Sequence, residues 1–542
     1  MPSTKKLLSI TNLKKYFPVA KSSIFQKEQL YVRANEEITL DIYEGETLGV
    51  VGESGCGKST LGRVLLQLYD QTAGTTMYYG IPRASVAPAY VTDTLRHADR
   101  YLTKLKKEQA KAEALTAKVA EAGENATFFE IQAKNLAVAE AQTTLAHIAK
   151  IMGGFLVRDS KAGAQLLCQQ AVCEERIAKL SGAVRDLRLE AESLENELSG
   201  QSEARKKRTE KALAKLRKAE HAKEAEIAVR RLSIEKLQEK IAERKAPFAE
   251  DAEFQKYEAM LDDGIDLARL KYSEMRLLRK DLQVIFQDPY SSLNPRMTIG
   301  QIIEEGLVTH RFFKDNTARS REAMKQYILS VMRQCGLQDY MIHRYPHQFS
   351  GGQRQRISIA RALAVHPKFV VCDECVSALD VSIQSQIINL LEELKEKEHL
   401  TYLFISHDLS VVRYISDRIC VMYLGNIVEL ASAATVFSDP RHPYTVALLS
   451  SIPTTDMESL SKERILLEGN IPSPIRPPSG CKFHTRCYMA CDRCRRVPPP
   501  LTEIEPGHFV ACHFPERKLD ENGNYLFELP KTEKKSVRLA ED

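Results

Sequence analysis

Hydrophobic and polar residues follow three different patterns along the chain. Residues 1–80 mix short apolar runs, such as Thr47–Val51, with a glycine-rich turn, and the same texture returns from about residue 271. Between them, residues 81–270 read as nearly continuous helix, because good helix formers dominate and no proline occurs from Ala89 to Ala246. The pattern predicts an α/β protein that a long α-helical segment interrupts.

Within the helical segment, apolar residues recur at alternating spacings of three and four. The clearest seam consists of Ile177, Leu180, Val184, Leu187, Ala191, Leu194 and Leu198. This spacing is typical of helices that pack along their length, as in a coiled coil. The polar segment 199–202 should end the first helix, and a second helix from Glu203 to about Lys245 should return antiparallel. The pattern also predicts an earlier helical hairpin, with helices at about 95–121 and 126–152 and a turn at 122–125.

The composition is that of an ordinary globular protein. Apolar residues make up 43% and charged residues 27% of the 542 residues, and the net charge is +5. Such an even balance gives no argument for nucleic acid, so no nucleic-acid partner is expected. No run approaches the roughly 18 apolar residues of a membrane-spanning helix, and no signal peptide is recognisable. We therefore expect a cytosolic protein that reaches the membrane only through a partner.

A glycine-rich loop gives the strongest chemical signal. Residues 52–60 match the pattern GxxxxGK[ST] and lie between a strand-like and a helix-like run, which is the context that this motif requires. Its glycines let main-chain N–H groups and a helix N-terminus surround phosphate groups. Lys58 would contact the β- and γ-phosphates of a nucleotide, and the Ser59 hydroxyl would bind Mg²⁺. The loop residues predicted to bind nucleotide are Gly52, Ser54, Gly55, Cys56, Gly57, Lys58, Ser59 and Thr60.

A second apolar run ends in two carboxylates. Residues 369–372 read as a buried parallel strand, and Asp373 and Glu374 follow at its carboxyl end, where such sheets bind ligands. We expect Asp373 to reach Mg²⁺, directly or through water. Glu374 should act as the general base that polarises the attacking water. Together with the loop, these residues predict a nucleotide hydrolase.

Several further segments resemble the motifs of ABC-transporter ATPases and occur in the order of that family. The matching residues are Ser350, Gly351, Gly352 and Gln353 for the signature, Gln287 for the Q-loop, Asp380 for the D-loop and His407 for the switch histidine. The resemblance implies a P-loop core with a RecA-like subdomain, an antiparallel β subdomain and a helical signature subdomain. It also implies that Gln287 and His407 serve hydrolysis, and that Gln287 joins Ser59 and Asp373 at Mg²⁺.

The same resemblance implies a partner. In this family the signature faces ATP bound to the opposite subunit, and this chain has one copy of each motif, so it needs a second ATPase subunit. An aromatic residue near the N-terminus usually stacks on adenine. Tyr16 and Phe17 are the candidates, and we prefer Phe17.

Two stretches, residues 290–296 and 467–487, narrow the resemblance to the oligopeptide/dipeptide importer ATPases, and within them to the second of two non-identical subunits. It implies a motor at the cytoplasmic face of the cell membrane that drives two transmembrane permease subunits. An extracellular peptide-binding protein would act on it indirectly. Residues 441–445 also resemble this group and are expected to be structural. Cys375 departs from the group, which usually has proline there.

Five of the 12 cysteines fall between Cys481 and Cys512. Such spacing in a cytosolic chain favours metal over disulfide, and four thiolates suit either structural zinc or a [4Fe–4S] cluster. Free thiols in a proline-rich tail remain an alternative. The resemblance implies the iron–sulfur cluster, with Cys481, Cys487, Cys494 and Cys512 as ligands and Cys491 as an extra residue.

The motifs divide the chain into five parts. They are residues 1–80 (first part of the ATPase core), 81–270 (inserted helical domain), 271–435 (rest of the core), 436–520 (Cys-rich extension) and 521–542 (tail). The insertion should follow an antiparallel β segment at 75–80 and end just before the Q-loop strand. Typical importer ATPases have no counterpart of it.

Two other classes of ABC protein remain as alternatives. ATPases of DNA maintenance and repair also carry a coiled coil between phosphate loop and signature. Their coil follows the Q-loop, however, whereas Gln287 here follows the helical segment, and the Cys-rich tail would have no role. Translation-factor ABC proteins carry two ATPase cassettes in one chain, and this chain has one.

Overall fold

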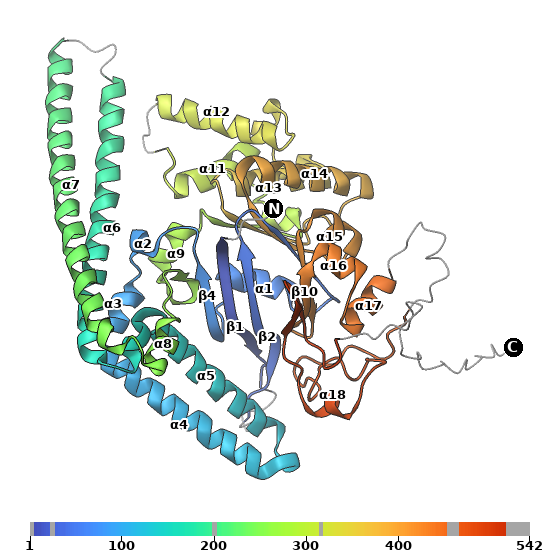
Figure 1. Cartoon of the computed structure of the whole chain (residues 1–542). Helices are drawn as coiled ribbons and strands as arrows, with labels where there is room; N and C mark the ends of the chain where they lie inside the picture. The colour runs from blue at the N-terminus through green and yellow to red at the C-terminus, as the bar shows by residue number, and fades with distance from the viewer. Residues whose placement is uncertain (1–4, 22–27, 198–202, 314–317, 452–464, 516–542) are drawn as a thin grey trace.

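The structure is a computed structural model that describes residues 5–21, 28–197, 203–313, 318–451 and 465–515. Two β-sheets lie at its centre, helices pack around them, and a pair of long helices projects away from the rest (Figure 1). None of the helices in these ranges is both long and apolar enough to cross a membrane.

An eight-stranded sheet carries the parallel strands that the apolar runs predict. Its order is β11-β12-β10-β9-β3-β8-β7-β6. The parallel strands are β3 (Thr47–Val51), β6 (Leu282–Ile285), β7 (Phe369–Asp373), β8 (Thr401–Ile405) and β9 (Arg418–Tyr423). Every residue of β3, β7 and β8 is buried, as expected of parallel strands that are covered on both faces. The predicted α/β fold is confirmed.

The C-terminal part of the chain extends this sheet. Three strands continue it in antiparallel fashion beyond β9: β10 (Asn426–Ser432), β12 (His508–Val510) and β11 (Thr502–Glu505). Glu429 of β10 is fully buried and accepts a hydrogen bond from the His508 ring of β12 at 2.8 Å. The Cys-rich extension is therefore built onto the core sheet.

A second, antiparallel sheet has the order β2-β1-β4-β5. Its strands are β1 (Lys6–Pro18), β2 (Tyr31–Tyr43), β4 (Ala73–Tyr78) and β5 (Ile265–Asp266). Although β4 and β5 are almost two hundred residues apart in sequence, Tyr78 pairs with Ile265 and Met77 with Asp266. The helical segment therefore leaves and rejoins the sheet at one place.

The chain between β4 and β5 is helical, as predicted, in several pieces. They are α2 (Arg83–Val86), α3 (Ala89–Arg96), α4 (Ala98–Ala122), α5 (Phe128–Met152), α6 (Ser160–Glu197), α7 (Glu203–Lys245) and α8 (Ala252–Glu258). The two expected hairpins correspond to α4–α5 and α6–α7, whereas the expected break at 199–202 lies outside the described residues. The expectation of helix up to residue 270 fails at β5, because pairing with β4 outweighs local helix propensity.

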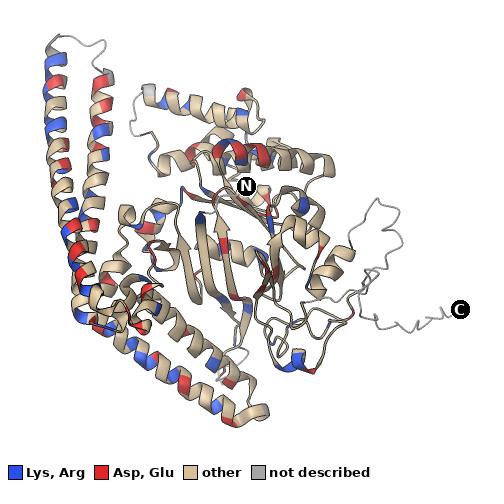
Figure 2. Cartoon of the chain, viewed as in Figure 1, with Lys and Arg blue, Asp and Glu red and all other residues tan. Residues whose placement is uncertain are grey.

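An apolar seam and charged outer faces characterise the α6–α7 hairpin. Leu180, Val184 and Ile227 are buried where the two helices meet. Arg176 of α6 forms an ion pair with Glu226 of α7 at 2.8 Å, and basic and acidic residues alternate along both helices (Figure 2). The α5 helix instead lies beside the antiparallel sheet, where the Thr143 hydroxyl accepts a hydrogen bond from the Gly74 amide at 2.8 Å.

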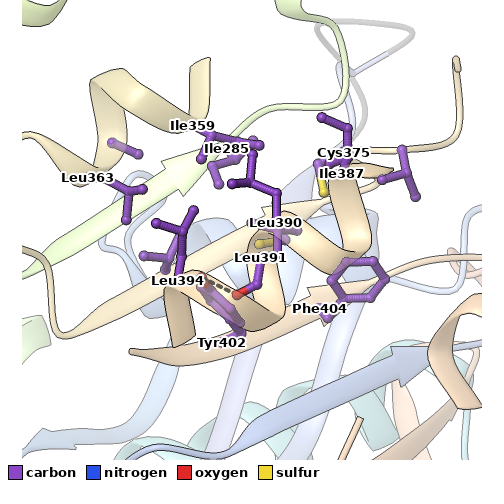
Figure 3. Packing of buried hydrophobic residues seen from close by; sticks show 14 of the residues in the cluster. Ile285, Ile359, Leu363, Cys375, Ile387, Leu390, Leu391, Leu394, Tyr402 and Phe404 are labelled. Atoms are coloured by element: carbon purple, nitrogen blue, oxygen red, sulfur yellow. Dashed lines mark hydrogen bonds between the residues drawn. The ribbon is translucent and has the colours of Figure 1, made fainter. Parts of the chain in front are cut away.

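The remaining helices belong to the ATPase core and the extension. They are α1 (Lys58–Leu65), α9 (Tyr272–Leu278), α10 (Pro289–Ser292), α11 (Ile299–Thr309), α12 (Ala318–Gln334), α13 (Gly351–Leu363), α14 (Val381–Glu398), α15 (Leu409–Ile415), α16 (Ala433–Ser438), α17 (Pro443–Ser450) and α18 (Asp492–Arg496). Leucines and isoleucines of α13 and α14 pack on β6, β7 and β8 (Figure 3). The buried Tyr402 hydroxyl donates to the Leu391 carbonyl at 3.1 Å, so even this core tyrosine is satisfied.

Candidate functional site

The carboxyl ends of three neighbouring strands form one edge of the main sheet. The register places Val50 of β3 opposite Ile405 of β8, and Ile405 opposite Asp373 of β7. The residues that follow these positions must therefore emerge side by side, as ligand-binding segments of parallel sheets do. They are the glycine-rich loop, His407 and Glu374, which the sequence singles out separately.

Close packing fixes the loop against the sheet. Gly57 caps α1 in the left-handed region, with φ +103°, and a Cβ at this position would lie 2.1 Å from the Ala34 carbonyl oxygen. One turn further on, a Cβ at Gly62 would lie 2.7 Å from a methyl carbon of Val371. The two glycines allow this close packing, and α1 begins directly at the loop. Its unpaired N–H groups therefore lie at the loop.

Lys58 lies folded across the loop. Its side chain is buried, and its ammonium group donates to the carbonyl oxygens of Gly52 at 2.8 Å and Glu53 at 3.1 Å. Burial raises the pKa of the neighbouring Cys56 thiol, so this cysteine stays neutral. The loop therefore holds one cation at its centre and no competing thiolate, which suits it to an anionic ligand.

Asp373 presents an unsatisfied carboxylate oxygen beside α1. Its side chain is buried, and its Oδ2 atom lies 3.4 Å from a guanidinium nitrogen of Arg63. Within the described part of the chain, its Oδ1 atom has no hydrogen-bond partner. Buried polar atoms are rarely left unpaired, and carboxylate oxygen is the preferred ligand of Mg²⁺. Asp373 therefore fits the magnesium ligand that the sequence predicts.

Glu374 is the point where three predicted residues meet. The Gln287 side-chain amide donates to its Oε2 atom at 2.8 Å, and the His407 Nδ1 atom lies 3.6 Å from the same oxygen. Glu374 has φ +47°, which is unusual for a residue with a side chain, and its amide donates to the Ile405 carbonyl at 3.0 Å. Strained backbone that neighbouring strands hold in place is typical of functional sites.

Comparison with known proteins identifies this arrangement. Residues 35–243 and 253–377 match the family model described as ABC transporter. The chain belongs to the ABC transporter family. Residues 428–494 match a second model, described as the C-terminal region of oligopeptide/dipeptide transporters. ABC ATP-binding proteins are ATPases.

Two curated relatives of this ABC ATPase are oligopeptide transport ATP-binding proteins. AppF of Bacillus subtilis is 52% identical over 256 residues, which is 47% of this chain and 76% of AppF. OppF of Haemophilus influenzae is 50% identical over 250 residues, which is 46% of this chain and 74% of OppF. The similarity confirms the sequence-based resemblance, and the DNA-maintenance alternative finds no support in it.

The signature residues of the ABC ATPase lie at the start of α13. Ser350 caps this helix, and its hydroxyl accepts from the Gln353 amide while the Gln353 side chain accepts from the Ser350 amide. Ser350 and Gly351 are both exposed. Next to them, a Cβ at Gly351 would lie 3.6 Å from Leu379, so the signature adjoins the segment that carries the exposed Asp380.

The two candidate aromatic residues of this ABC ATPase differ in environment. Tyr16 is buried, and its hydroxyl donates to Glu36 at 2.7 Å. Phe17 is half-buried, with the ring of Tyr69 edge-on at 5.4 Å and the Lys15 ammonium 4.7 Å from its ring centre. Tyr16 is therefore committed to the core, whereas Phe17 keeps part of its ring accessible.

The four cysteines that match the family extension line a single cavity of about 10 Å³: Cys481, Cys487, Cys494 and Cys512. Burial raises the pKa of Cys481 to about 11 and that of Cys487 to about 12. However, no three His, Cys, Asp or Glu side chains of the described ranges are arranged to hold a metal ion. The predicted iron–sulfur cluster, or zinc, therefore finds a shared cavity but no metal-binding arrangement.

Two residues at the loop of this ABC ATPase escape prediction from the sequence. Both terminal guanidinium nitrogens of Arg486 donate hydrogen bonds to the Glu53 carboxylate, at 2.7 and 3.0 Å. The Tyr444 hydroxyl accepts a hydrogen bond from the Glu53 amide at 2.9 Å. Tyr444 belongs to the segment 441–445, for which we expected only a structural role. No local pattern signals these contacts, because they join residues about four hundred positions apart.

Proposed function

We propose that this chain is the ATP-hydrolysing motor subunit of an importer for oligopeptides or dipeptides. The observation that carries the proposal is the convergence of Gln287 and His407 on Glu374, beside a phosphate-binding loop that ends at Lys58. The relatives AppF and OppF, which are named as oligopeptide transport ATP-binding proteins, supply the substrate class.

In this mechanism the loop amides and Lys58 bind the phosphates of ATP. Mg²⁺, held by Ser59, Asp373 and Gln287, would neutralise charge on the β- and γ-phosphates. Glu374 accepts a proton from the attacking water, and the nearby Gln287 and His407 hold its carboxylate in place. Phe17 stacks on the adenine ring, and its accessible ring surface supports this assignment.

A second homologous ATPase subunit completes the site. The N-terminus of α13, at which Ser350 and Gly351 are exposed, would present the signature to the γ-phosphate of ATP on that subunit, since a helix N-terminus favours anions. The signature residues are Ser350, Gly351, Gly352 and Gln353. Asp380 would lie at the same contact. The heterodimer would drive two permease subunits from the cytoplasmic face of the membrane, with an extracellular peptide-binding protein acting indirectly.

The Cys-rich extension holds a [4Fe–4S] cluster in this proposal, with zinc as the alternative. Four cysteines line one cavity, which supports a shared ligand. Tetrahedral zinc requires four sulfur atoms about 2.3 Å from one point, whereas a cluster is larger and is held from around its surface. The resemblance of this extension to that of the oligopeptide/dipeptide importer ATPases is what favours the cluster over zinc.

The helical insertion forms a domain of its own that leaves the ATPase core intact. The pairing of Tyr78 with Ile265 supports this view, because the insertion starts and ends on adjacent strands. Insertions are tolerated where the two ends of the inserted segment lie close together.

The proposed function is tested by two substitutions in the assembled transporter. Glu374→Gln should retain ATP binding and lower phosphate release by at least about a hundredfold, because an amide cannot accept the water proton. Lys58→Ala should abolish ATP binding itself. Glu396→Gln, an exposed carboxylate of α14, serves as the control. Normal phosphate release by Glu374→Gln would refute the role of Glu374, and normal ATP affinity of Lys58→Ala would refute that of the loop.

A further inference from the structure

The segment between the first two cysteines of the extension contacts both the phosphate loop and the antiparallel sheet. Arg486, next to Cys487, contacts the phosphate loop. Lys482, next to Cys481, contacts Glu36 of the antiparallel sheet, to which Phe17 also belongs. Neither residue belongs to a nucleotide-binding motif, so the contacts require a separate explanation.

The contact with the phosphate loop is a two-point ion pair. Both terminal nitrogens of Arg486 donate to Glu53, and the Arg486 side chain is only 6% exposed. The guanidinium also lies 6.0 Å from the ring centre of Tyr423. Arginine–carboxylate pairs of this geometry fix orientation as well as distance, and they are strongest where water is excluded.

Glu53 is held at its carboxylate, its amide and its carbonyl. Its carboxylate pairs with Arg486, its amide donates to the buried Tyr444 hydroxyl, and its carbonyl accepts from Lys58. Glu53 thus connects Arg486 to Lys58, the cation that would bind phosphate. A shift of the Glu53 backbone would therefore move Lys58 as well.

The contact with the antiparallel sheet is also buried. The Lys482 ammonium donates to Glu36 at 2.9 Å and to the Leu424 carbonyl at 3.0 Å. Glu36 in turn accepts from the Tyr16 hydroxyl, and Tyr16 precedes Phe17 in β1. The five-residue stretch 482–486 of the extension is thus anchored at the phosphate loop and, through Glu36 and Tyr16, at the strand that carries Phe17.

We propose that Arg486 is a positioning residue of this ATPase, supplied by the Cys-rich extension. It acts through Glu53, holds the phosphate loop and Lys58 in the geometry that binds ATP, and does not itself contact nucleotide. Lys482 is the second anchor that fixes the same stretch. The inference rests on the proposed ATP-binding function and adds to it a reason for the extension to be joined to the ATPase core.

The test compares Arg486→Gln, Glu53→Gln and the double variant in the full-length chain. Each single variant should weaken ATP binding about tenfold, within the range of typical coupling between sites, with kcat changed less than twofold. The double variant should bind ATP no more weakly than either single variant, because both remove one interaction. Arg486→Lys should recover part of the affinity, since one hydrogen bond can form. Arg493→Gln, an exposed arginine of the same extension, should bind ATP normally.

The outcomes separate this inference from the proposed function. Wild-type chain that fails to bind ATP would refute the proposed function. Wild-type chain that binds ATP, together with single variants that bind it equally well, would overturn the positioning role. Additive losses in the double variant would overturn it too. The melting temperature of each variant without nucleotide distinguishes the two roles. If Arg486 only stabilised the fold, the melting temperature would fall along with the affinity for ATP, whereas a positioning role lowers the affinity and leaves the melting temperature nearly unchanged. Glu53→Gln provides the same comparison if Arg486→Gln does not fold.

Discussion

Glu36 is a buried carboxylate that faces three cations, and its replacement should destabilise the fold measurably. Its Oε2 atom accepts from Lys482 at 2.9 Å, and its Oε1 atom accepts from the Tyr16 hydroxyl at 2.7 Å. Arg33 and Lys14 lie 3.7 and 3.9 Å from Oε1. Glu36→Gln keeps the shape of the side chain and removes the charge that these three cations face.

The size of the effect follows from the pKa of Glu36. Burial alone would raise it, but the charges of Lys482, Arg33 and Lys14 and the hydrogen bond from Tyr16 lower it from the ordinary 4.5 to about 2. Burial also lowers the pKa of Lys482, yet the two other cations keep the carboxylate ionised. The difference corresponds to about 3 kcal/mol of folding free energy.

The sign of the pH dependence is fixed by the direction of this shift. Because the folded state binds the proton more weakly than the unfolded state, the stabilisation is complete above about pH 5 and declines as the pH falls from 4.5 towards 2. Glu36→Gln should therefore cost about 3 kcal/mol at neutral pH and about 2 kcal/mol at pH 3.5.

Urea unfolding of the wild-type protein and of Glu36→Gln at pH 7 and pH 3.5 measures these differences in the free energy of unfolding. Glu37→Gln is the matched control, because Glu37 is the adjacent carboxylate, pairs with Lys14 and is 64% exposed. It should change stability little, as exposed ion pairs do. A Glu36→Gln variant no less stable than Glu37→Gln, or a gap that stays constant between the two pH values, would refute this account.

Two further predictions concern the extension and the insertion. Anaerobically purified protein should show the brown absorbance of an iron–sulfur cluster, which Cys487→Ser diminishes and Cys491→Ser preserves; colourless protein with stoichiometric zinc would reverse the assignment. Val184→Asp places a carboxylate in the buried seam of α6–α7. It should lower the unfolding temperature of the hairpin, measured by circular dichroism, while ATP hydrolysis stays normal. The control Val229→Asp, at a 61% exposed position, should change neither quantity. Loss of ATP hydrolysis in Val184→Asp would contradict the independence of the insertion.

The parts of the structure that sequence predicts well are those with a local signal. The glycine pattern around Lys58 requires a strand before it and a helix after it, and β3 and α1 are found there. The seam from Ile177 predicts helices that pack lengthwise, and Val184 is buried in it. In each case the physical constraint acts over a few residues, so the pattern is visible in any short window.

The parts that sequence misses depend on pairing between distant residues. Strand β5 is two residues long and has no pattern of its own, and it exists because Ile265 pairs with Tyr78. Likewise, nothing near Arg486 indicates Glu53 as its partner. In the sequence, Gln287, His407 and Glu374 belong to separate motifs. Only the strand register places Gln287 and His407 beside one carboxylate oxygen of Glu374.

The position of β5 also explains how a long insertion can coexist with an ATPase core. The chain leaves the antiparallel sheet after Tyr78 and returns in the neighbouring register at Ile265, so the two ends are held by strand hydrogen bonds. The insertion is therefore joined to the core at a place that strand pairing holds fixed. The Cys-rich extension stands in the opposite relation to the core, because Arg486 pairs with Glu53 of the phosphate loop and Lys482 with Glu36 of the antiparallel sheet. Of the two additions to the ATPase, the extension is thus the one whose rearrangement should change the affinity for ATP.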